Sequence, residues 1–266
     1  MNITLFTGNQ PRHLYFAKIL SAICEKLFVV QECNTIFPGE ISDFYDNSLV
    51  MQHYFTKVRF SEKKVFGKID FLPSNVYQLS IKDGDLDFIG LEDLGEAINS
   101  EVFIVYGSSY IKGELADFLV KRNTINIHMG VSPYYRGNSS NFWAMYYRTP
   151  ELVGATIMKL DYGLDSGPTY YHCFPKSQAC DGFDLGMLAV KAAQVSVVDK
   201  IKDNSLFSMS PQYLKRNIVD TYCYRRRSDF TDDVVSEYLD NMMSPSEIYQ
   251  HLENRKLDIF LNAIEG

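Results

Sequence analysis

The chain has 266 residues, of which 46% are hydrophobic and 22% charged, and its formal net charge is −7. This length allows one large buried core, and the acidic balance argues against a nucleic-acid-binding surface, which would carry basic patches. None of the five cysteines forms a Cys-x-x-Cys pair, so we expect no metal site or disulfide framework, but the reduced thiols of a cytoplasmic protein.

The first part of the chain alternates between strand and helix patterns. Residues 2–7 alternate in polarity, residues 12–26 carry apolar side chains at helical spacing, and residues 27–31 form a second apolar run. A helix over about 46–64 and a short strand over 76–79 follow. This order predicts an α/β fold, a Rossmann-like doubly wound and mostly parallel sheet.

The turn after the first strand is a candidate anion site. A helix that starts behind Gly8-Asn9-Gln10 would present free backbone amides to an anion, and Arg12 and His13 would add charge. The alternative is an ordinary strand-to-helix turn, because these residues do not match a dinucleotide-binding fingerprint.

Two further strands lead to the most informative stretch. Residues 102–106 predict a buried strand, and residues 124–127 predict the end of another, with a helix beginning near Gly113 between them. Asn126 and His128 are two positions apart, so their side chains point the same way on an extended backbone. In α/β sheets ligands bind beyond the carboxyl ends of strands, where this pair would lie.

Asp165 lies in a second loop, between strand patterns at residues 153–160 and 169–174. The Asn126 amide, the His128 imidazole and the Asp165 carboxylate can therefore come together at one edge of the sheet. This trio suits acyl transfer to an amine, since the imidazole and the amide can stabilise an oxyanion and the carboxylate can orient the imidazole and assist proton removal. The alternative is that Asn126, His128 and Asp165 are ordinary loop residues, which are often of these types.

The order of motifs resembles the folate-dependent formyltransferases, most closely the sugar N-formyltransferases. The resemblance is clearest between Val102 and His172, and its motifs are Asn126-Ile127-His128, Pro133-x-Tyr135-Arg136-Gly137, Gly154-x-Thr156 and Leu164-Asp165-x-Gly167-Pro168. The chain departs from the family at Met129 to Ser132, where a Pro-Ser-Leu-Leu run is usual, and at Met158, where many members have histidine.

The resemblance implies roles for these residues. It implies that Asn126, His128 and Asp165 are catalytic and that 10-formyltetrahydrofolate, without a metal, gives the formyl group. The loops that would line the folate pocket contribute Tyr106, Gly107, Ser108, Tyr110, Asp161 and Gly163. An equally good interpretation of Tyr106 is that its side chain packs in the hydrophobic core. The acceptor would contact Arg12 and His13 through a nucleotide diphosphate, and Arg136 would hold an anion or only fasten its loop.

The sequence changes character after about residue 205. We expect a catalytic domain over 1–205 and a C-terminal extension over 206–266, in which Ser244 and Glu247 form a capping box. Arg225 to Arg227 are either a solvated face or an anion contact. The extension is too short and acidic for the basic barrel with which methionyl-tRNA formyltransferases bind tRNA.

We therefore expect a cytoplasmic enzyme that formylates the amine of a nucleotide-linked amino sugar. The alternatives are glycinamide ribonucleotide or methionyl-tRNA formyltransferase, formyltetrahydrofolate deformylase, or a non-catalytic folate- or nucleotide-binding protein. The expected partners are small molecules, not nucleic acid or membrane, since no apolar run reaches the ~18 residues of a membrane helix. The sequence is also compatible with a homodimer.

Overall fold

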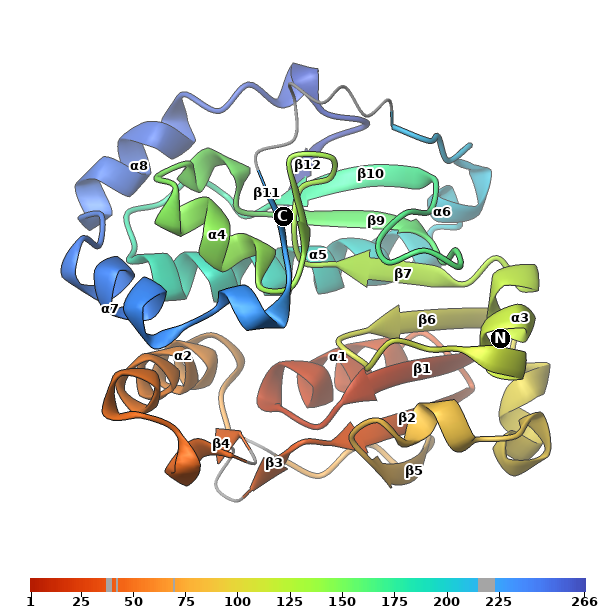
Figure 1. Ribbon diagram of the computed structural model, residues 1–266. Helices are drawn as coiled ribbons and strands as arrows, with labels where there is room; N and C mark the ends of the chain where they lie inside the picture. The colour runs from red at the N-terminus through yellow and green to blue at the C-terminus, as the bar shows by residue number, and fades with distance from the viewer. Residues whose placement is uncertain (37–39, 42, 69, 215–222) are drawn as a thin grey trace.

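The computed structural model describes residues 1–36, 40–41, 43–68, 70–214 and 223–266 (Figure 1). Its centre is an eight-stranded sheet in the order β12-β10-β9-β7-β6-β1-β2-β5. These strands are β1 (Asn2–Gly8), β2 (Lys26–Cys33), β5 (Val76–Lys82), β6 (Val102–Tyr106), β7 (Ile125–His128), β9 (Ala155–Lys159), β10 (Thr169–Phe174) and β12 (Ile264–Glu265). Only β9 runs antiparallel to its described neighbours, β7 and β10. The expected mostly parallel sheet is thereby confirmed.

Helices cover the sheet on both faces. The α-helices are α1 (Pro11–Ser21), α2 (Leu49–Phe66), α3 (Gly113–Lys121), α4 (Ser140–Tyr146), α5 (Gly182–Lys202), α6 (Ser205–Ser208), α7 (Asp232–Asp240) and α8 (Pro245–Glu253). Short 3₁₀ helices are η1 (Phe44–Asp46), η2 (Asp85–Phe88), η3 (Leu91–Asn99), η4 (Pro150–Leu152), η6 (Arg227–Asp229) and η7 (Leu257–Ile259). The two-residue strands β3 (Thr35–Ile36) and β4 (Glu40–Ile41) form a separate antiparallel pair.

Alternation along the central strands builds two cores. On β1, Ile3 and Leu5 face a core shared with α1 and α5, whereas Phe6 faces a second core shared with α3 and η3. Successive side chains of a strand point to opposite faces, so one buried strand supplies both layers. The central parallel strands therefore read as continuous apolar runs, which is typical of sheets covered on both sides.

The C-terminal part packs on the rest of the fold. Strand β11 (Cys223–Arg225) pairs in parallel with β8 (Tyr135–Gly137), and β12 extends the main sheet beside β10. Helices α7 and α8 share a third core with α4, at the left of the view in Figure 1. The division between residues 205 and 206 stays a prediction.

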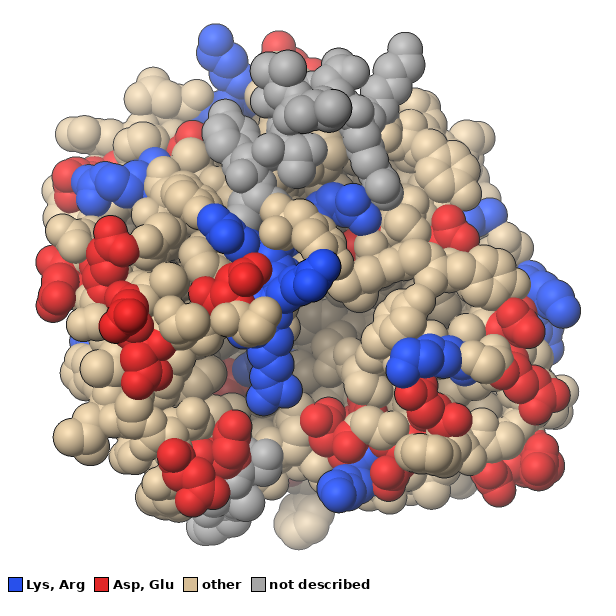
Figure 2. Space-filling view, viewed as in Figure 1, with Lys and Arg blue, Asp and Glu red and all other residues tan. Residues whose placement is uncertain are grey.

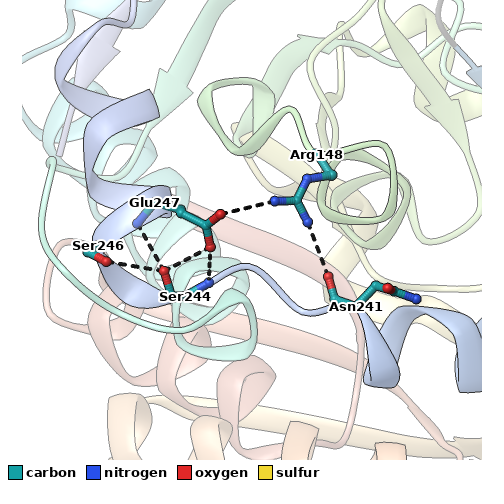
Figure 3. A network of polar contacts seen from close by, with 5 residues as sticks. All are labelled: Arg148, Asn241, Ser244, Ser246 and Glu247. Carbon is teal, nitrogen blue, oxygen red and sulfur yellow. Dashed lines mark hydrogen bonds and ion pairs between the residues drawn. The ribbon is translucent and has the colours of Figure 1, made fainter.

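A polar network fastens this C-terminal part to the end of α4 (Figure 3). Arg148 donates to the Asn241 carbonyl at 3.3 Å and to Glu247 Oε1 at 3.2 Å. Glu247 also accepts from the Ser244 backbone N–H at 2.7 Å, while Ser244 caps α8. The capping box predicted from the sequence is confirmed.

Candidate active site

A cavity of about 550 Å³ lies at the carboxyl ends of β6 and β7. Figure 2 shows the face of the molecule that is hollowed, with Lys and Arg side chains along one border of the hollow. Nearly all the residues predicted from the sequence line this cavity: Arg12, His13, Tyr106, Gly107, Ser108, Tyr110, Asn126, His128, Asp161, Gly163 and Asp165. Arg136 lines a smaller neighbouring cavity of about 180 Å³ that also contacts Asp165.

Asn126, His128 and Asp165 meet in this cavity. The Nδ1 atom of His128 lies 3.2 Å from Asp165 Oδ2, and the Asn126 side chain hydrogen-bonds to the same carboxyl group. The Nε2 atom of His128 faces the Tyr135 carbonyl at 3.3 Å, which is a long contact for an N–H donor.

The pair of His128 and Asp165 favours its charged form. Burial alone would lower the pKa of His128, but the charge and the hydrogen bond of Asp165 outweigh it and raise that pKa. Burial alone would raise the pKa of Asp165, but His128, the charge of Arg136 and the Asn126 hydrogen bond together lower it. An imidazolium at this position can donate from both nitrogens, one to Asp165 and one towards a developing oxyanion.

The loop after β7 is held by two buried side chains. Thr156, from the Gly-x-Thr motif, donates to the Gly130 carbonyl at 2.6 Å and accepts from the Ser132 N–H at 2.9 Å. His172 donates from Nε2 to the Ser132 carbonyl at 2.7 Å, and burial lowers the pKa of His172 to about 4. A Cβ at Gly130 would lie 2.6 Å from His128 Nε2, so only glycine fits there. The sequence reasoning missed His172.

The loop that follows β6 is held by Glu32, which the sequence reasoning also missed. Glu32 is 1% exposed and lies near the end of β2. Its carboxylate accepts from the Ser109 N–H at 2.5 Å, the Ser109 hydroxyl at 2.7 Å and the Gly84 N–H at 2.8 Å. The one available signal was an acid at the carboxyl end of a strand in a doubly wound sheet, where site residues gather.

The resemblance implies that this loop lines a folate pocket. On that basis we expect Glu32→Ala to weaken folate binding about tenfold or more, because hydrogen bonds to a charged group contribute about 1.5–3 kcal/mol each. Without them, the loop of Ser108 and Tyr110 would be free to move. Isothermal titration with 5-formyltetrahydrofolate measures this, and Glu96→Gln, at an exposed acid, is the control. An unchanged Kd in Glu32→Ala would mean that this loop does not contact the folate.

The N-terminal turn differs from the expectation. Arg12 donates to Glu62 Oε1 at 2.7 Å and hydrogen-bonds to Tyr106, so its charge is already balanced. Burial, and then the charge of Arg12, lower the pKa of His13 well below its ordinary value. The expected charge on His13 is therefore wrong, because α1 seats the ring against Gly8 and Gly107. Tyr106 both lines the cavity and packs against Phe16.

Arg136 fastens its loop. Its guanidinium donates to the Leu164 carbonyl at 2.8 Å, beside Asp165, and stacks over the Tyr224 ring at 5.9 Å. Arg136 therefore makes the loop-fastening contact that was one of the two alternatives for this residue. This contact links β8 to the Asp165 loop. An anion contact by Arg136 stays a prediction.

The described part of the chain shows neither a metal cluster nor a membrane-spanning helix. Within the described ranges there is no group of His, Cys, Asp and Glu side chains placed to hold a metal ion. None of the described helices has the length and apolar character needed to span a membrane.

Comparisons with known proteins find formyltransferases among the proteins that this chain resembles. No family model matches it. It is 33% identical over 78 residues to the methionyl-tRNA formyltransferase of Thermosynechococcus vestitus, covering 29% of this chain and 23% of that protein. It is 26% identical over 125 residues to that of Trichodesmium erythraeum, covering 42% of this chain and 37% of that protein. The chain thus spans well under half the length of the curated relatives it matches.

Solved structures extend the likeness over most of the chain. An N-formyltransferase from Helicobacter canadensis, in complex with folinic acid and dTDP-3-aminofucose, has a TM-score of 0.53 at 13% identity, covering 89% of this chain and 79% of that one. A sugar N-formyltransferase from a Shewanella species has a TM-score of 0.52 at 15% identity, covering 86% and 78%. The chain therefore has the α/β formyltransferase fold. These matches confirm the resemblance to the folate-dependent formyltransferases, and several of the neighbours are sugar N-formyltransferases.

Proposed function

We propose that this chain is an N-formyltransferase that moves a formyl group from 10-formyltetrahydrofolate to the amine of a nucleotide-linked amino sugar. The observation that carries the proposal is the meeting of Asn126, His128 and Asp165 in one cavity at the end of β7. The proposed catalytic domain is residues 1–205, with 206–266 as an extension packed on it. A cytoplasmic location and a homodimer stay predictions.

The folate end of the cavity fits a flat, partly polar ring. Ile111, Ala116, Val120 and Leu160 supply apolar walls, and the turn from Gly107 to Tyr110 brings backbone groups to the same space. Pockets of this composition, apolar with a few placed polar groups, are typical of cofactor sites. We therefore assign this end to 10-formyltetrahydrofolate, which supplies the electrophilic formyl carbon.

Asn126, His128 and Asp165 have different roles in amine formylation. As the acceptor amine bonds to the formyl carbon, Asn126 and the imidazolium of His128 donate hydrogen bonds to the oxygen that gains charge. Asp165 holds His128 in its charged form and assists removal of the proton from the attacking amine. Collapse of the oxyanion restores the formyl C=O and breaks the bond to folate N10, which takes up a proton and leaves as tetrahydrofolate.

Two observations support a nucleotide-linked sugar as the acceptor. Two structural neighbours were solved in complex with nucleotide-linked sugars, dTDP-3-aminofucose in one and a UDP-linked 4-formamido sugar in the other. The chain also has a net charge of −7, which is unsuited to a tRNA footprint. Glycinamide ribonucleotide is the second candidate, because a formyltransferase for that substrate is among the structural neighbours with a TM-score of 0.50.

A panel of acceptors tests the proposal. The protein is incubated with 10-formyltetrahydrofolate and, separately, dTDP- and UDP-linked amino sugars, glycinamide ribonucleotide and charged initiator tRNA. We expect a mass gain of one formyl group on a nucleotide sugar only. Formylation of glycinamide ribonucleotide or tRNA alone would contradict the sugar assignment, and formate release without any acceptor would identify a deformylase.

A further inference from the structure

The cavity has a second end, which the folate does not need. It lies between α2, α4, α5 and α7 and is lined by Tyr54, Phe142, Met145, Met187, Val190 and Tyr238. We call this the α5 compartment. It adjoins the catalytic histidine, because Gly130, beside His128 Nε2, also contacts Ser140 at the start of α4. A ligand group in the α5 compartment therefore lies next to the reacting centre.

Two glycines one turn apart on α5 shape this compartment. A Cβ at Gly182 would lie 2.6 Å from the Tyr238 hydroxyl and 2.9 Å from Met145, so Gly182 lets these side chains close on the helix. A Cβ at Gly186 would meet no atom within 4 Å, and Gly186 lines the cavity. Gly186 is thus the point at which open space reaches the backbone of α5.

The lining of the α5 compartment defined above is apolar and uncharged, half of it aromatic, and it includes two phenols. Neither the Tyr54 nor the Tyr238 hydroxyl makes a hydrogen bond to a described residue, and their ring centroids lie 6.4 Å apart. Burial raises the pKa of both phenols, so both are neutral and can donate or accept. Such walls disfavour a phosphate, whose charge would lose its hydration there, and suit the C–H faces and few polar substituents of a deoxysugar ring.

We propose that the α5 compartment receives the pyranose ring of a deoxy amino sugar and that Gly186 sets how large a substituent the ring can carry on that side. This inference rests on the proposed function. The reacting amine is borne by the sugar, so the ring must lie beside His128. A nucleobase, which presents several donors and acceptors along its edge, would leave most of them unpaired against two phenols.

The test fills the open space at Gly186. Gly186→Leu adds a side chain where a Cβ has no neighbour, and leucine favours a helix by about 1 kcal/mol over glycine, so the fold should persist. With dTDP-3-aminofucose as acceptor, we expect KM to rise at least tenfold in Gly186→Leu and less in Gly186→Ala. The Kd for 5-formyltetrahydrofolate should stay within twofold. Asp199→Leu, on the exposed side of the same helix, is the control.

The outcomes distinguish a failure of the α5 compartment proposal from a failure of the proposed function. A Gly186→Leu variant with unchanged KM would overturn the proposal, and so would one that loses folate binding instead, since the compartment would then belong to the donor. If the wild type formylates no sugar, the proposed function fails by itself. The compartment is then tested by the shift in melting temperature that dTDP-3-aminofucose causes: loss of the shift in Gly186→Leu supports it, and an equal shift overturns it.

Discussion

Replacing His128 by alanine is expected to lower kcat roughly 100-fold or more, the usual scale for losing an oxyanion donor or an acid–base group. The variant loses one of the two proposed donors to the developing oxyanion and leaves Asp165 without its ion-pair partner at 3.2 Å. Asn126→Ala and Asp165→Ala are expected to fall in the same range. Folate affinity should change far less, because the hydrogen bonds of these side chains are strongest in the transition state.

Steady-state kinetics at saturating folate measures this effect. His251→Ala is a matched control, since His251 also pairs with a carboxylate, Glu151, but lies on the surface away from the cavity lining. A near-normal kcat for His128→Ala would remove the catalytic assignment. A loss of folate binding as large as the loss of kcat would show instead that the substitution disturbs the pocket.

The second large effect concerns stability. Arg12→Ala is expected to lower the free energy of unfolding by about 3–5 kcal/mol, because it leaves the carboxylate of Glu62 buried without its partner. Glu62 is only 3% exposed and lies 2.7 Å from the guanidinium. The pair joins α1 to α2, which forms one wall of the α5 compartment. The ion pair gives Arg12 a positioning role, and the diphosphate contact expected from the sequence stays a prediction.

Urea unfolding measures the stability change. Arg12→Ala/Glu62→Ala should recover part of the loss, since the buried charge is gone, and Lys26→Ala, from an exposed ion pair with Glu96, should change little. If Arg12→Ala unfolds like the wild type but raises KM for the nucleotide sugar, Arg12 does contact the diphosphate.

The central strands and the polar residues at their ends could be predicted from sequence because the signals are local. The run at 102–106 and the spacing of Asn126 and His128 each lie within a few residues. Glu32 and Ser109 are 77 positions apart, and His172 and Ser132 are 40 apart, so no local pattern joins them. Their pairing appears only once the sheet places β2 and β10 beside these loops.

Burial at the N-terminal turn is equally hidden from a local pattern. The position of His13 at the start of a helix suggests an exposed, chargeable ring, but Gly8 and Gly107 leave room for it to pack against the turn and Tyr106. Two-residue and three-residue strands such as β12 and β11 carry too few residues for an alternating pattern. Their pairing with β10 and β8 is set by tertiary packing.

The most direct test of folate-dependent formyl transfer at His128 is a single-turnover reaction with 10-formyltetrahydrofolate labelled with carbon-13 in the formyl group. With dTDP-3-aminofucose present, the wild type should place the label on the sugar amine as a formamide. His128→Ala, at folate concentrations that saturate it, should transfer the label roughly 100-fold more slowly. Transfer at equal rates by both proteins, or label recovered from the wild type only as formate, would contradict the account.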